Sequence, residues 1–276
     1  AENSNEWMSQ LLACVYQASE HSGDATELSA KELAEGLGAD YQSWVIAPLV
    51  EGYTSMVSGG LGRDLTWAKD DLALQNIQAR VRSPGIWMLA NVRKSLLLAT
   101  SNRSEAAVGY ATMDGDTSGG LSPVGGIDKA FLREWLVWLE TEGSELVQPI
   151  PELKYVNSLQ PTAELRPSDH GQTDESDLMP YPILDAIERA AIRDKRAPLS
   201  IYILIREHFS DYSAEQLRAW VLKFFRLWCR NQWKRERYAP SFHVDDENLD
   251  PKTWCRFPIL SSGFTAELRD LEKYNG

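Results

Sequence analysis

Side chains that could bind a nucleotide gather in residues 96–129. The run begins with four apolar residues, Leu96–Ala99, which predict a buried strand that Thr100 follows directly. Ligands of open α/β sheets bind at the carboxyl ends of the strands, so Thr100 is a candidate contact. Glu105 stands in the first turn of a predicted helix, and Lys129 begins another helix. An acid and a lysine on either side of a glycine-rich loop predict a site for a nucleotide and a metal ion.

The loop between these helices, residues 113–126, is rich in glycine and contains Asp114 and Asp116. Glycine lets the backbone approach a ligand closely and exposes amide groups to anions. Glycine-rich loops are also common as plain connectors between a strand and a helix. The spacing alone therefore leaves a phosphate site and a structural turn as alternatives.

Two other stretches carry basic side chains at helical spacing. In the predicted helical tract 67–93, which Pro84 should interrupt at Ser83, one face presents amide groups and Arg80. In residues 223–237, basic side chains alternate with Trp220, Phe224 and Trp228. Such interleaving is found in nucleic-acid-binding surfaces, but we favour a buried aromatic seam with a solvated basic face.

Composition limits the classes of function. The chain has 276 residues and a formal net charge of −12, which argues against general affinity for nucleic acids. No apolar run approaches the ~20 residues of a membrane span, so we expect no membrane partner. The three cysteines form no metal-binding or disulfide pattern, and we expect free thiols in a reducing cytoplasm.

The order of the predicted elements favours an α/β fold. Apolar runs at Leu11–Ala18 and Gln42–Ile46 predict strands, and a helix follows each of them. This alternation is typical of a parallel sheet with crossover helices, and the last third of the chain is predicted to be helical. The amphipathic segment 130–140 predicts a helix whose aromatic residues, Phe131, Trp135 and Trp138, pack in the core. Residues 141–180 have no regular period and predict a linker or a lid.

Six motifs occur in an order and at a spacing that resemble the NAD synthetase family. They are NIQAR (76–80), TSNRSEAAVGY (100–110), GDTSGG to PVGGIDK (115–129), PTAELRP (161–167), GQTDE (171–175) and WKRERYAP (233–240). They extend over most of residues 10–260 and look closest to the synthetase part of bacterial glutamine-dependent enzymes. The resemblance implies an α/β three-layer sandwich with a parallel sheet of the adenine-nucleotide hydrolase kind, formed by one domain over residues 1–276.

The resemblance also implies a reaction. Members of the family activate the carboxylate of nicotinic acid adenine dinucleotide (deamido-NAD) with ATP, and ammonia then displaces AMP to give NAD. The implied cofactors are ATP and Mg²⁺, because two polyanions must meet at one site. In glutamine-dependent members the ammonia comes from a glutaminase domain. The family further implies a homodimer or larger homo-oligomer formed through helices of the 67–93 region.

The family motifs assign roles to eight residues of this chain. Thr100, Lys129 and Thr162 match ATP contacts, with Lys129 also stabilising charge in the reaction, and Glu105 matches a Mg²⁺ ligand. The matches to dinucleotide contacts are Arg80, Asp116, Lys234 and Arg235.

The chain departs from the family pattern in several places. Met113 stands where members often have lysine, and Gly120 stands where they often have aspartate. The family's Ser-Gly-Gly-x-Asp-Ser loop, expected upstream of Leu11, is not in this sequence, and neither is a glutaminase domain. We therefore expect a domain that is incomplete at its N-terminus and inactive in isolation. The alternatives are a non-catalytic fragment or assembly module and an RNA-binding surface at 223–237.

Overall fold

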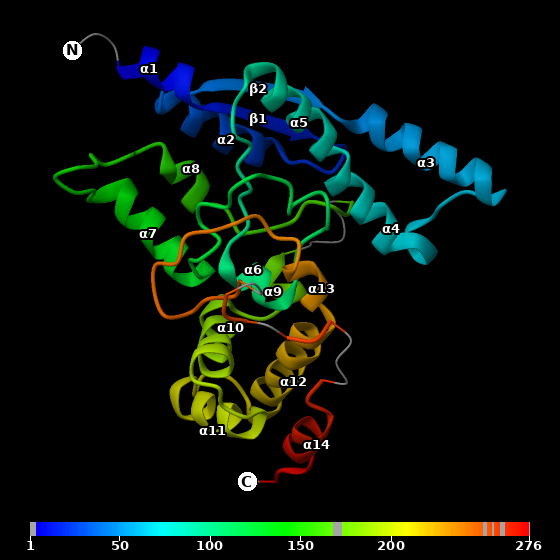
Figure 1. The fold of residues 1–276 in the computed structure, drawn as a ribbon, viewed down its shortest axis with the longest axis vertical. Coiled ribbons are helices and arrows are strands. Elements are labelled where there is room, and N and C mark those ends of the chain that lie inside the picture. Colours follow the sequence, from blue (N-terminus) through cyan, green and yellow to red (C-terminus); the bar gives the residue numbers. More distant parts are fainter. Residues whose placement is uncertain (1–3, 168–172, 251–252, 256, 260–262, 276) are drawn as a thin grey trace. The chain divides into compact units, whose positions relative to one another are not determined.

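The computed structural model describes residues 4–167, 173–250, 253–255, 257–259 and 263–275 (Figure 1). The first two residues of the GQTDE motif lie outside this set. The chain divides into two compact units, each made from two separate stretches of sequence. Unit 1 comprises Ala1–Arg93 and Arg133–Asp174, and unit 2 comprises Lys94–Leu132 and Glu175–Gly276.

The sheet of unit 1 confirms the predicted parallel α/β arrangement. Strand β1 (Ala13–Ala18) pairs in parallel with β2 (Asp40–Val45), in a register that aligns Ala13 with Asp40 and Ala18 with Val45. Helix α2 (Asp24–Gly36) connects the two strands and packs on both of them (Figure 1). The first strand begins two residues later than predicted, because Leu11 ends helix α1 (Ser4–Leu11).

Three helices follow the sheet. Helix α3 (Ala47–Leu61) begins with a proline in its first turn and ends at Gly62, whose φ of 65° is the left-handed conformation that glycine adopts without strain. Helices α4 (Trp67–Arg80) and α5 (Arg82–Arg93) are separated at Val81. The break therefore comes before the predicted Ser83, because Pro84 fits into the first turn of α5, where its missing N–H costs no hydrogen bond.

The predicted linker, residues 141–180, contains ordered structure where it is described. Helix α8 (Leu153–Asn157) packs on α2, and Gln78 Nε2 donates to the carbonyl oxygen of Leu165 at 2.7 Å. The hydroxyl of Thr26 donates to Glu164 Oε1 at 2.6 Å. These bonds hold residues 153–165 against α2 and Gln78 within unit 1, and a lid-like movement of this segment stays a prediction.

Helix α7 (Lys129–Thr141) corrects one expectation. Phe131, Trp135 and Trp138 are 55%, 37% and 39% exposed, so they are not core residues, whereas Leu139 is buried. The helical period identified an apolar face, but it could not say whether this chain covers that face. The boundary between the two units falls within this helix.

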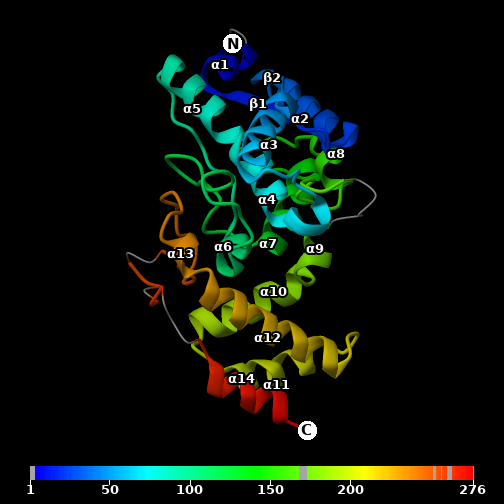
Figure 2. The same ribbon diagram turned by 90° about the vertical axis from the view of Figure 1, so that its right-hand side faces the viewer.

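Unit 2 is built around a helical core. The buried side chains come mainly from α6 (Arg103–Val108), α10 (Tyr181–Glu188), α11 (Pro198–His208), α12 (Ala214–Arg230) and α14 (Thr265–Lys273). Figures 1 and 2 show α11 and α12 side by side, with α14 against both of them. The remaining helical segments are short: α9 (Asp174–Asp177), the π-helical turn η2 (Arg189–Arg193) and α13 (Gln232–Arg235).

The expected strand at Leu96–Ala99 is not formed. This segment makes one isolated bridge, between Leu98 and Leu121, and its backbone bonds go to the glycine loop: Ala99 N donates to Leu121 O at 2.8 Å and Gly120 N donates to Leu97 O at 2.8 Å. Leu96 and Leu98 are 61% and 41% exposed, so the run lacks the burial expected of a strand in the middle of a sheet.

The aromatic seam of α12 is confirmed, but its basic face is only partly solvated. Phe224 and Trp228 are buried, and Ser213 and Gln216 form a capping box at the start of the helix. Lys223 Nζ donates to the carbonyl oxygens of Asp177 and Leu178 at 2.6 and 3.0 Å instead of facing solvent. In the part of the chain that the structure describes, no helix has the length and apolar character needed to cross a bilayer.

Candidate functional site

Helix α6 places Glu105 by a reciprocal cap. Asn102 precedes the helix, and its side-chain oxygen accepts from Glu105 N at 3.0 Å. In return, Glu105 Oε2 accepts from Asn102 N at 3.3 Å. This capping box satisfies two backbone donors at once and fixes the carboxylate at the positive end of the helix.

The capped carboxylate of Glu105 also meets Lys129, the first residue of α7. Lys129 Nζ lies 2.9 Å from Glu105 Oε1 and 5.6 Å from the centre of the Tyr181 ring. The two charged side chains are 20% and 17% exposed, so both reach solvent and neither is sealed in the core. The structure thus brings together the acid and the lysine that the sequence singled out.

The backbone at the start of α7 is held by a second buried carboxylate, that of Asp185 on α10. Asp185 Oδ1 accepts from Ser104 Oγ at 2.5 Å, and Oδ2 accepts from Ala130 N at 2.9 Å. Burial raises the pKa of Asp185 to about 7, although these two hydrogen bonds act in the opposite direction. No motif in the sequence indicates this residue, because it stands 81 positions from Ser104.

The raised pKa of Asp185 predicts an unusual pH dependence of stability. The unfolded chain releases this proton near pH 3.8 and the folded chain near pH 7, so the free energy of unfolding contributed by this group falls as the pH rises from about 4 to about 7. The free energy of unfolding should fall by up to about 1.4 kcal/mol for each pH unit in this range.

Urea unfolding at pH 5, 6 and 7 checks this expectation. Other carboxylates add slopes of their own, so the informative quantity is the difference between the wild type and Asp185→Asn. The same pH dependence in both proteins would show that Asp185 does not titrate in this range.

Arg103, which is buried, forms the centre of an ionic cluster on the other side of α6. Its guanidinium lies 3.0 Å from Asp128, 3.0 Å from Glu188 and 2.8 Å from Asp245. Glu247, 3.7 Å from Arg103, also pairs with Arg189 at 2.8 Å. Burial, and then the charge of Asp185, raises the pKa of Glu188, while Arg103 lowers it. The cluster joins α6 to α10, to the start of α7 and to the segment after α13.

Asp116 lies in the glycine loop and is exposed on one side. Its carboxylate oxygen Oδ2 accepts from Thr112 N at 2.6 Å, and Arg237 pairs with the neighbouring Asp114 at 2.5 Å. Met113, where relatives often have lysine, is buried, whereas Gly120 is exposed. Polar contacts with Thr112 and Arg237 therefore hold the first part of the loop.

Lys234 and Arg235 contact the end of α6. Lys234 Nζ donates to the carbonyl oxygens of Gly109 and Ala111 at 2.7 and 2.8 Å. Arg235 is 2% exposed, and it donates to the carbonyl oxygens of Ala107 at 2.7 Å and of Trp228. Burial lowers the pKa of Arg235 to about 10. In this arrangement both side chains cap carbonyl groups, and their assignment to a dinucleotide stays a prediction.

Replacing Arg235 should therefore destabilise the protein. We expect Arg235→Met to lower the free energy of unfolding by about 3 kcal/mol, because the buried carbonyls of α6 and α12 lose their donor. Arg237→Met is the matched control, since its exposed pair with Asp114 should contribute less than about 1 kcal/mol. Chemical denaturation of both variants measures the difference, and equal losses would contradict the capping role.

The other predicted contacts are more exposed. Thr100 is exposed at the start of unit 2. In unit 1, Arg80 is exposed at the end of α4, and Thr162 is exposed with its hydroxyl accepting from Glu164 N at 3.3 Å. These three positions stay predicted nucleotide or dinucleotide contacts, each within its own unit.

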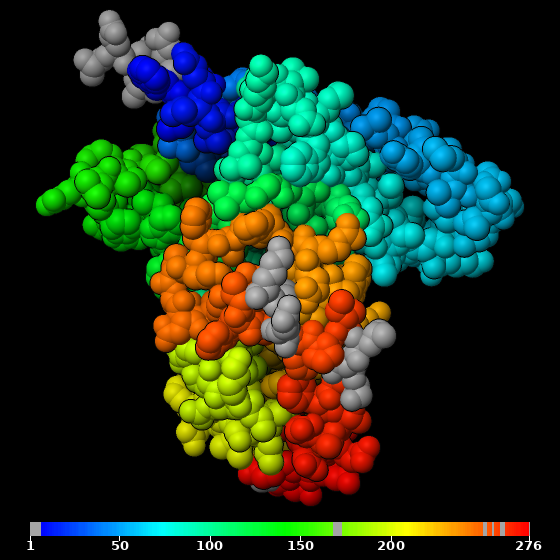
Figure 3. Space-filling view, in the orientation of Figure 1, coloured from blue at the N-terminus to red at the C-terminus, as the bar shows by residue number. Residues whose placement is uncertain are grey.

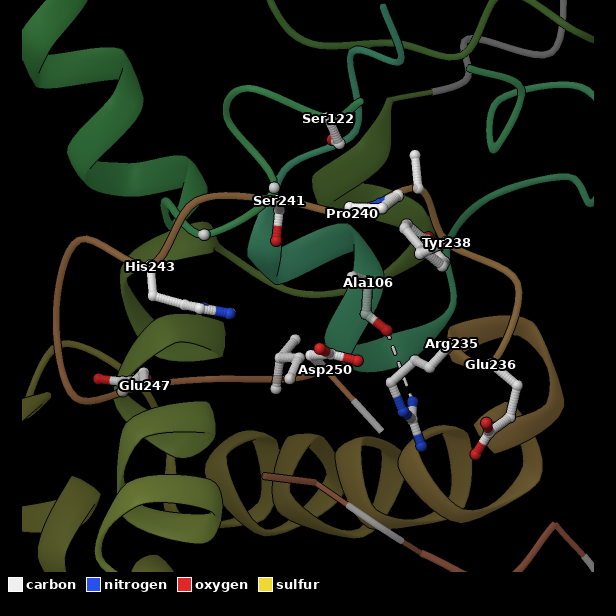
Figure 4. Close-up of a pocket in the computed structure, with 14 residues that line it drawn as sticks. Ala106, Ser122, Arg235, Glu236, Tyr238, Pro240, Ser241, His243, Glu247 and Asp250 are labelled. Atoms are coloured by element: carbon white, nitrogen blue, oxygen red, sulfur yellow. Dashed lines mark hydrogen bonds between the residues drawn. The ribbon is translucent and has the colours of Figure 1, made fainter. Parts of the chain in front are cut away.

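Each unit contains a pocket that the sequence did not indicate. In unit 1, a cavity of about 370 Å³ lies beyond the carboxyl ends of β1 and β2, where ligands of α/β sheets bind; its lining includes His21, Trp67 and Gln78. In unit 2, a cavity of about 190 Å³ lies beside α6, and Figure 4 shows His243, Ser241 and Asp250 around it. The dashed line in Figure 4 marks the contact of Arg235 with the carbonyl of Ala106.

Glu105 has the chemistry of a magnesium ligand when a nucleotide shares the ion. Among the described residues, no group of three or more histidine, cysteine, aspartate or glutamate side chains could hold a metal by itself. Mg²⁺ is usually bound by one or two carboxylates together with substrate phosphates, so a single carboxylate fits this pattern. The Glu105 oxygens each accept one hydrogen bond here and retain lone pairs for a cation.

Comparison with known proteins agrees with the sequence motifs. The NAD synthase family profile matches residues 8–226. The chain belongs to the NAD synthase family. It is 31% identical over 278 residues to the glutamine-dependent NAD(+) synthetase of Bos taurus, covering 94% of this chain and 39% of the relative. It is 32% identical over 250 residues to that of Aquifex aeolicus, covering 91% and 40%.

A solved structure extends this likeness to the fold. The crystal structure of a glutamine-dependent NAD(+) synthetase from Cytophaga hutchinsonii superposes with a TM-score of 0.84 and 46% identity, over 98% of this chain and 42% of that one. The chain thus has the adenine-nucleotide α-hydrolase-like fold of the NAD synthase family. It spans about two fifths of the length of these three relatives.

Proposed function

We propose that this chain is the synthetase part of a glutamine-dependent ligase that converts deamido-NAD to NAD with ATP. The Glu105–Lys129 pair carries the proposal, because it sets an acid and a lysine 2.9 Å apart with both reaching solvent. The identity to glutamine-dependent NAD(+) synthetases over more than nine tenths of this chain supports the substrate class. We assign the complete reaction to a longer protein, of the kind that these relatives are, and the synthetase step to this chain.

The proposed reaction has two steps. The carboxylate of deamido-NAD attacks the α-phosphorus of ATP, the bond to the bridging oxygen breaks, and pyrophosphate leaves. Ammonia then attacks the acyl carbon of the adenylate, and AMP leaves with the bonding electron pair. Glutamine hydrolysed by a separate domain would supply the ammonia.

The residues of unit 2 have distinct roles in this proposal. Lys129 donates hydrogen bonds to the phosphates and stabilises the charge that develops as pyrophosphate leaves. Thr100 binds ATP through its hydroxyl. Glu105 would hold Mg²⁺, which neutralises phosphate charge when bound. Asp116, Lys234 and Arg235 are the proposed dinucleotide contacts.

In unit 1, the motifs assign Thr162 to ATP and Arg80 to the dinucleotide. The cavity beyond β1 and β2 supports a nucleotide at this unit, because its lining combines the aromatic ring of Trp67 with polar groups such as Gln78. Both motifs lie within the part of the chain that the family profile matches, residues 8–226.

A quantitative assay tests the proposal. The full-length protein is incubated with deamido-NAD, MgATP and either glutamine or ammonium, and NAD, AMP and pyrophosphate are measured by chromatography. We expect equal amounts of the three products with either nitrogen source. ATP hydrolysis without NAD, or no turnover, would overturn the proposal and would favour the assembly module.

We also propose that the chain forms a homo-oligomer. Helix α3 buries none of its side chains, and Leu49, Tyr53 and Met56 are 53%, 46% and 68% exposed. On α5, Met88 and Val92 are 68% and 76% exposed, in the region that the family resemblance indicated. Figure 3 shows α3 and α5 at the surface, in light blue and in blue-green. Light scattering after size-exclusion chromatography measures the mass of the protein in solution. A monomer at about 50 µM would mean that any self-association is of roughly micromolar affinity or weaker, and it would contradict the proposed oligomer.

We propose a reducing, cytoplasmic setting for this protein, in which its thiols stay free. Cys14, Cys229 and Cys255 are free in the structure, and the last two are buried. Burial raises the pKa of both buried thiols, which makes them poor nucleophiles. A cytoplasmic location stays a proposal that fractionation of the source cells would test.

A further inference from the structure

The start of α7 is capped twice, once by the residue directly before the helix and once by a residue of α10. Asp128, directly before the helix, accepts from Phe131 N at 2.7 Å, which is the usual arrangement of a helix cap. The two preceding amide groups, of Lys129 and Ala130, have different acceptors. Ala130 N donates to Asp185 Oδ2 at 2.9 Å, and Lys129 N donates to Ser104 Oγ at 2.8 Å.

Ser104 connects the second of these amides to the same carboxylate. Its hydroxyl accepts from Lys129 N and donates to Asp185 Oδ1 at 2.5 Å. Both amides therefore end on Asp185, one directly and one through a hydroxyl group. Asp185 and Ser104 are 8% and 0% exposed, so water does not compete for these bonds.

The same face of α10 also contacts the side chain of Lys129. Tyr181 and Asp185 are four residues apart and so lie on one side of the helix. The Tyr181 ring lies under the Lys129 ammonium, at 5.6 Å from ring centre to Nζ, while Asp185 holds the backbone amide of Lys129 through the Ser104 hydroxyl. Lys129 is thus fixed at its backbone and at its tip.

We propose that Asp185 is a positioning residue, which holds the first turn of α7 so that the Lys129 ammonium stays beside Glu105 and the phosphates that both would bind. The proposal rests on the function proposed above. Burying a carboxylate is unfavourable, and an ordinary helix start needs one cap, which Asp128 already provides. A second, buried acceptor restricts where the helix can begin, and small misplacements of a catalytic group can lower a rate about 100-fold.

A double-mutant cycle separates positioning from general stability. The variants Asp185→Asn, Lys129→Met and the pair are compared in the full-length protein. Asparagine keeps the shape of the side chain but can accept only one of the two bonds. We expect Asp185→Asn to lower kcat about 10- to 100-fold with less than a 3-fold change in the KM for ammonium. In the Lys129→Met background, Asp185→Asn should lower kcat by less than about a further 2-fold.

Ser213→Ala is the matched control. It removes a cap from α12 in the same unit without touching α7, and we expect its kcat to stay within about 2-fold of the wild type. Ser104→Ala is a second test variant, which breaks only the relay to Lys129 N and should lower kcat less than Asp185→Asn. Independent effects of Asp185 and Lys129, or a loss of kcat in Ser213→Ala equal to that in Asp185→Asn, would overturn the proposal.

Amide hydrogen exchange provides a readout that needs no activity. In Asp185→Asn we expect exchange at Lys129 and Ala130 to become at least about 10-fold faster, with the remaining amides of α7 unchanged. Unchanged exchange at both amides would overturn the positioning role. An inactive wild-type protein would instead overturn the proposed function, and the exchange measurement would still decide whether Asp185 holds the helix.

Discussion

Lys129→Met should lower the rate of AMP formation by about 100- to 1,000-fold, the loss typical when one donor to a developing oxyanion is removed. The same change should lower the free energy of unfolding by no more than about 1 kcal/mol. The reason is that Lys129 and Glu105 form a partly exposed pair, and such pairs contribute little to stability. Single-turnover measurement of AMP release, together with urea unfolding, gives both quantities.

Lys154→Met serves as the control for this loss of charge. Lys154 also lies over a ring, with Nζ 4.8 Å from the centre of Tyr155, but it has no part in the proposed site. Its rate should stay within about 2-fold of the wild type, because only a weak exposed cation–π contact is lost. If Lys129→Met lost stability and rate in proportion, the residue would be structural and the proposed role would fail.

Arg103→Met should be among the most destabilising single changes in unit 2. The guanidinium is 1% exposed and lies within 3.0 Å of Asp128, Glu188 and Asp245. Its removal leaves the buried side chains of Asp128 and Glu188 without their counter-ion, for which we expect a loss of about 3–5 kcal/mol at pH 7. The measurement is the free energy of unfolding from urea titrations.

The loss in Arg103→Met should shrink as the pH is lowered from 7 to 5. Burial already raises the pKa of Glu188, and the charge of Arg103 opposes this rise. Without the guanidinium that pKa rises further, so protonation of Glu188 favours the folded state more in the variant than in the wild type. Arg226→Met is the control, because its pair with Glu272 is 61% and 48% exposed and should contribute less than about 1 kcal/mol. A loss below about 1 kcal/mol in Arg103→Met would mean that the cluster is solvated.

Local chemistry was readable from the sequence. The parallel pair of strands follows from two apolar runs separated by a helix, and the position of Glu105 follows from a capping motif within four residues. The sequence also predicts that Lys129 begins a helix after the glycine loop, and α7 does begin at this residue. These features could be predicted because they depend on residues close together in the sequence. Hydrophobic periodicity and helix-capping patterns describe such local relations.

The features that the sequence did not predict are contacts between distant parts of the chain. The pair Arg103–Asp245 joins residues 142 positions apart, and Ser104–Asp185 joins residues 81 apart. No local pattern distinguishes such a buried acid from a solvated one. Leu96–Ala99 has the composition of a strand, but strand formation needs a partner strand, and here the glycine loop takes its backbone bonds. In α7, the apolar period is real, but tertiary packing leaves Phe131 and Trp135 exposed.

The division of the chain into interleaved units has a consequence for synthesis on the ribosome. Unit 2 starts at Lys94, stops at Leu132 and resumes at Glu175, so the 94–132 stretch emerges long before its partners. Helix α6 has six residues, too few to persist alone, and Asn231 and Arg235 supply the donors for its last carbonyls. The nascent stretch that carries Glu105 and Lys129 must therefore wait, unfolded or held by a chaperone, until Asn231 and Arg235 have been synthesised, whereas unit 1 can close as soon as Asp174 has emerged.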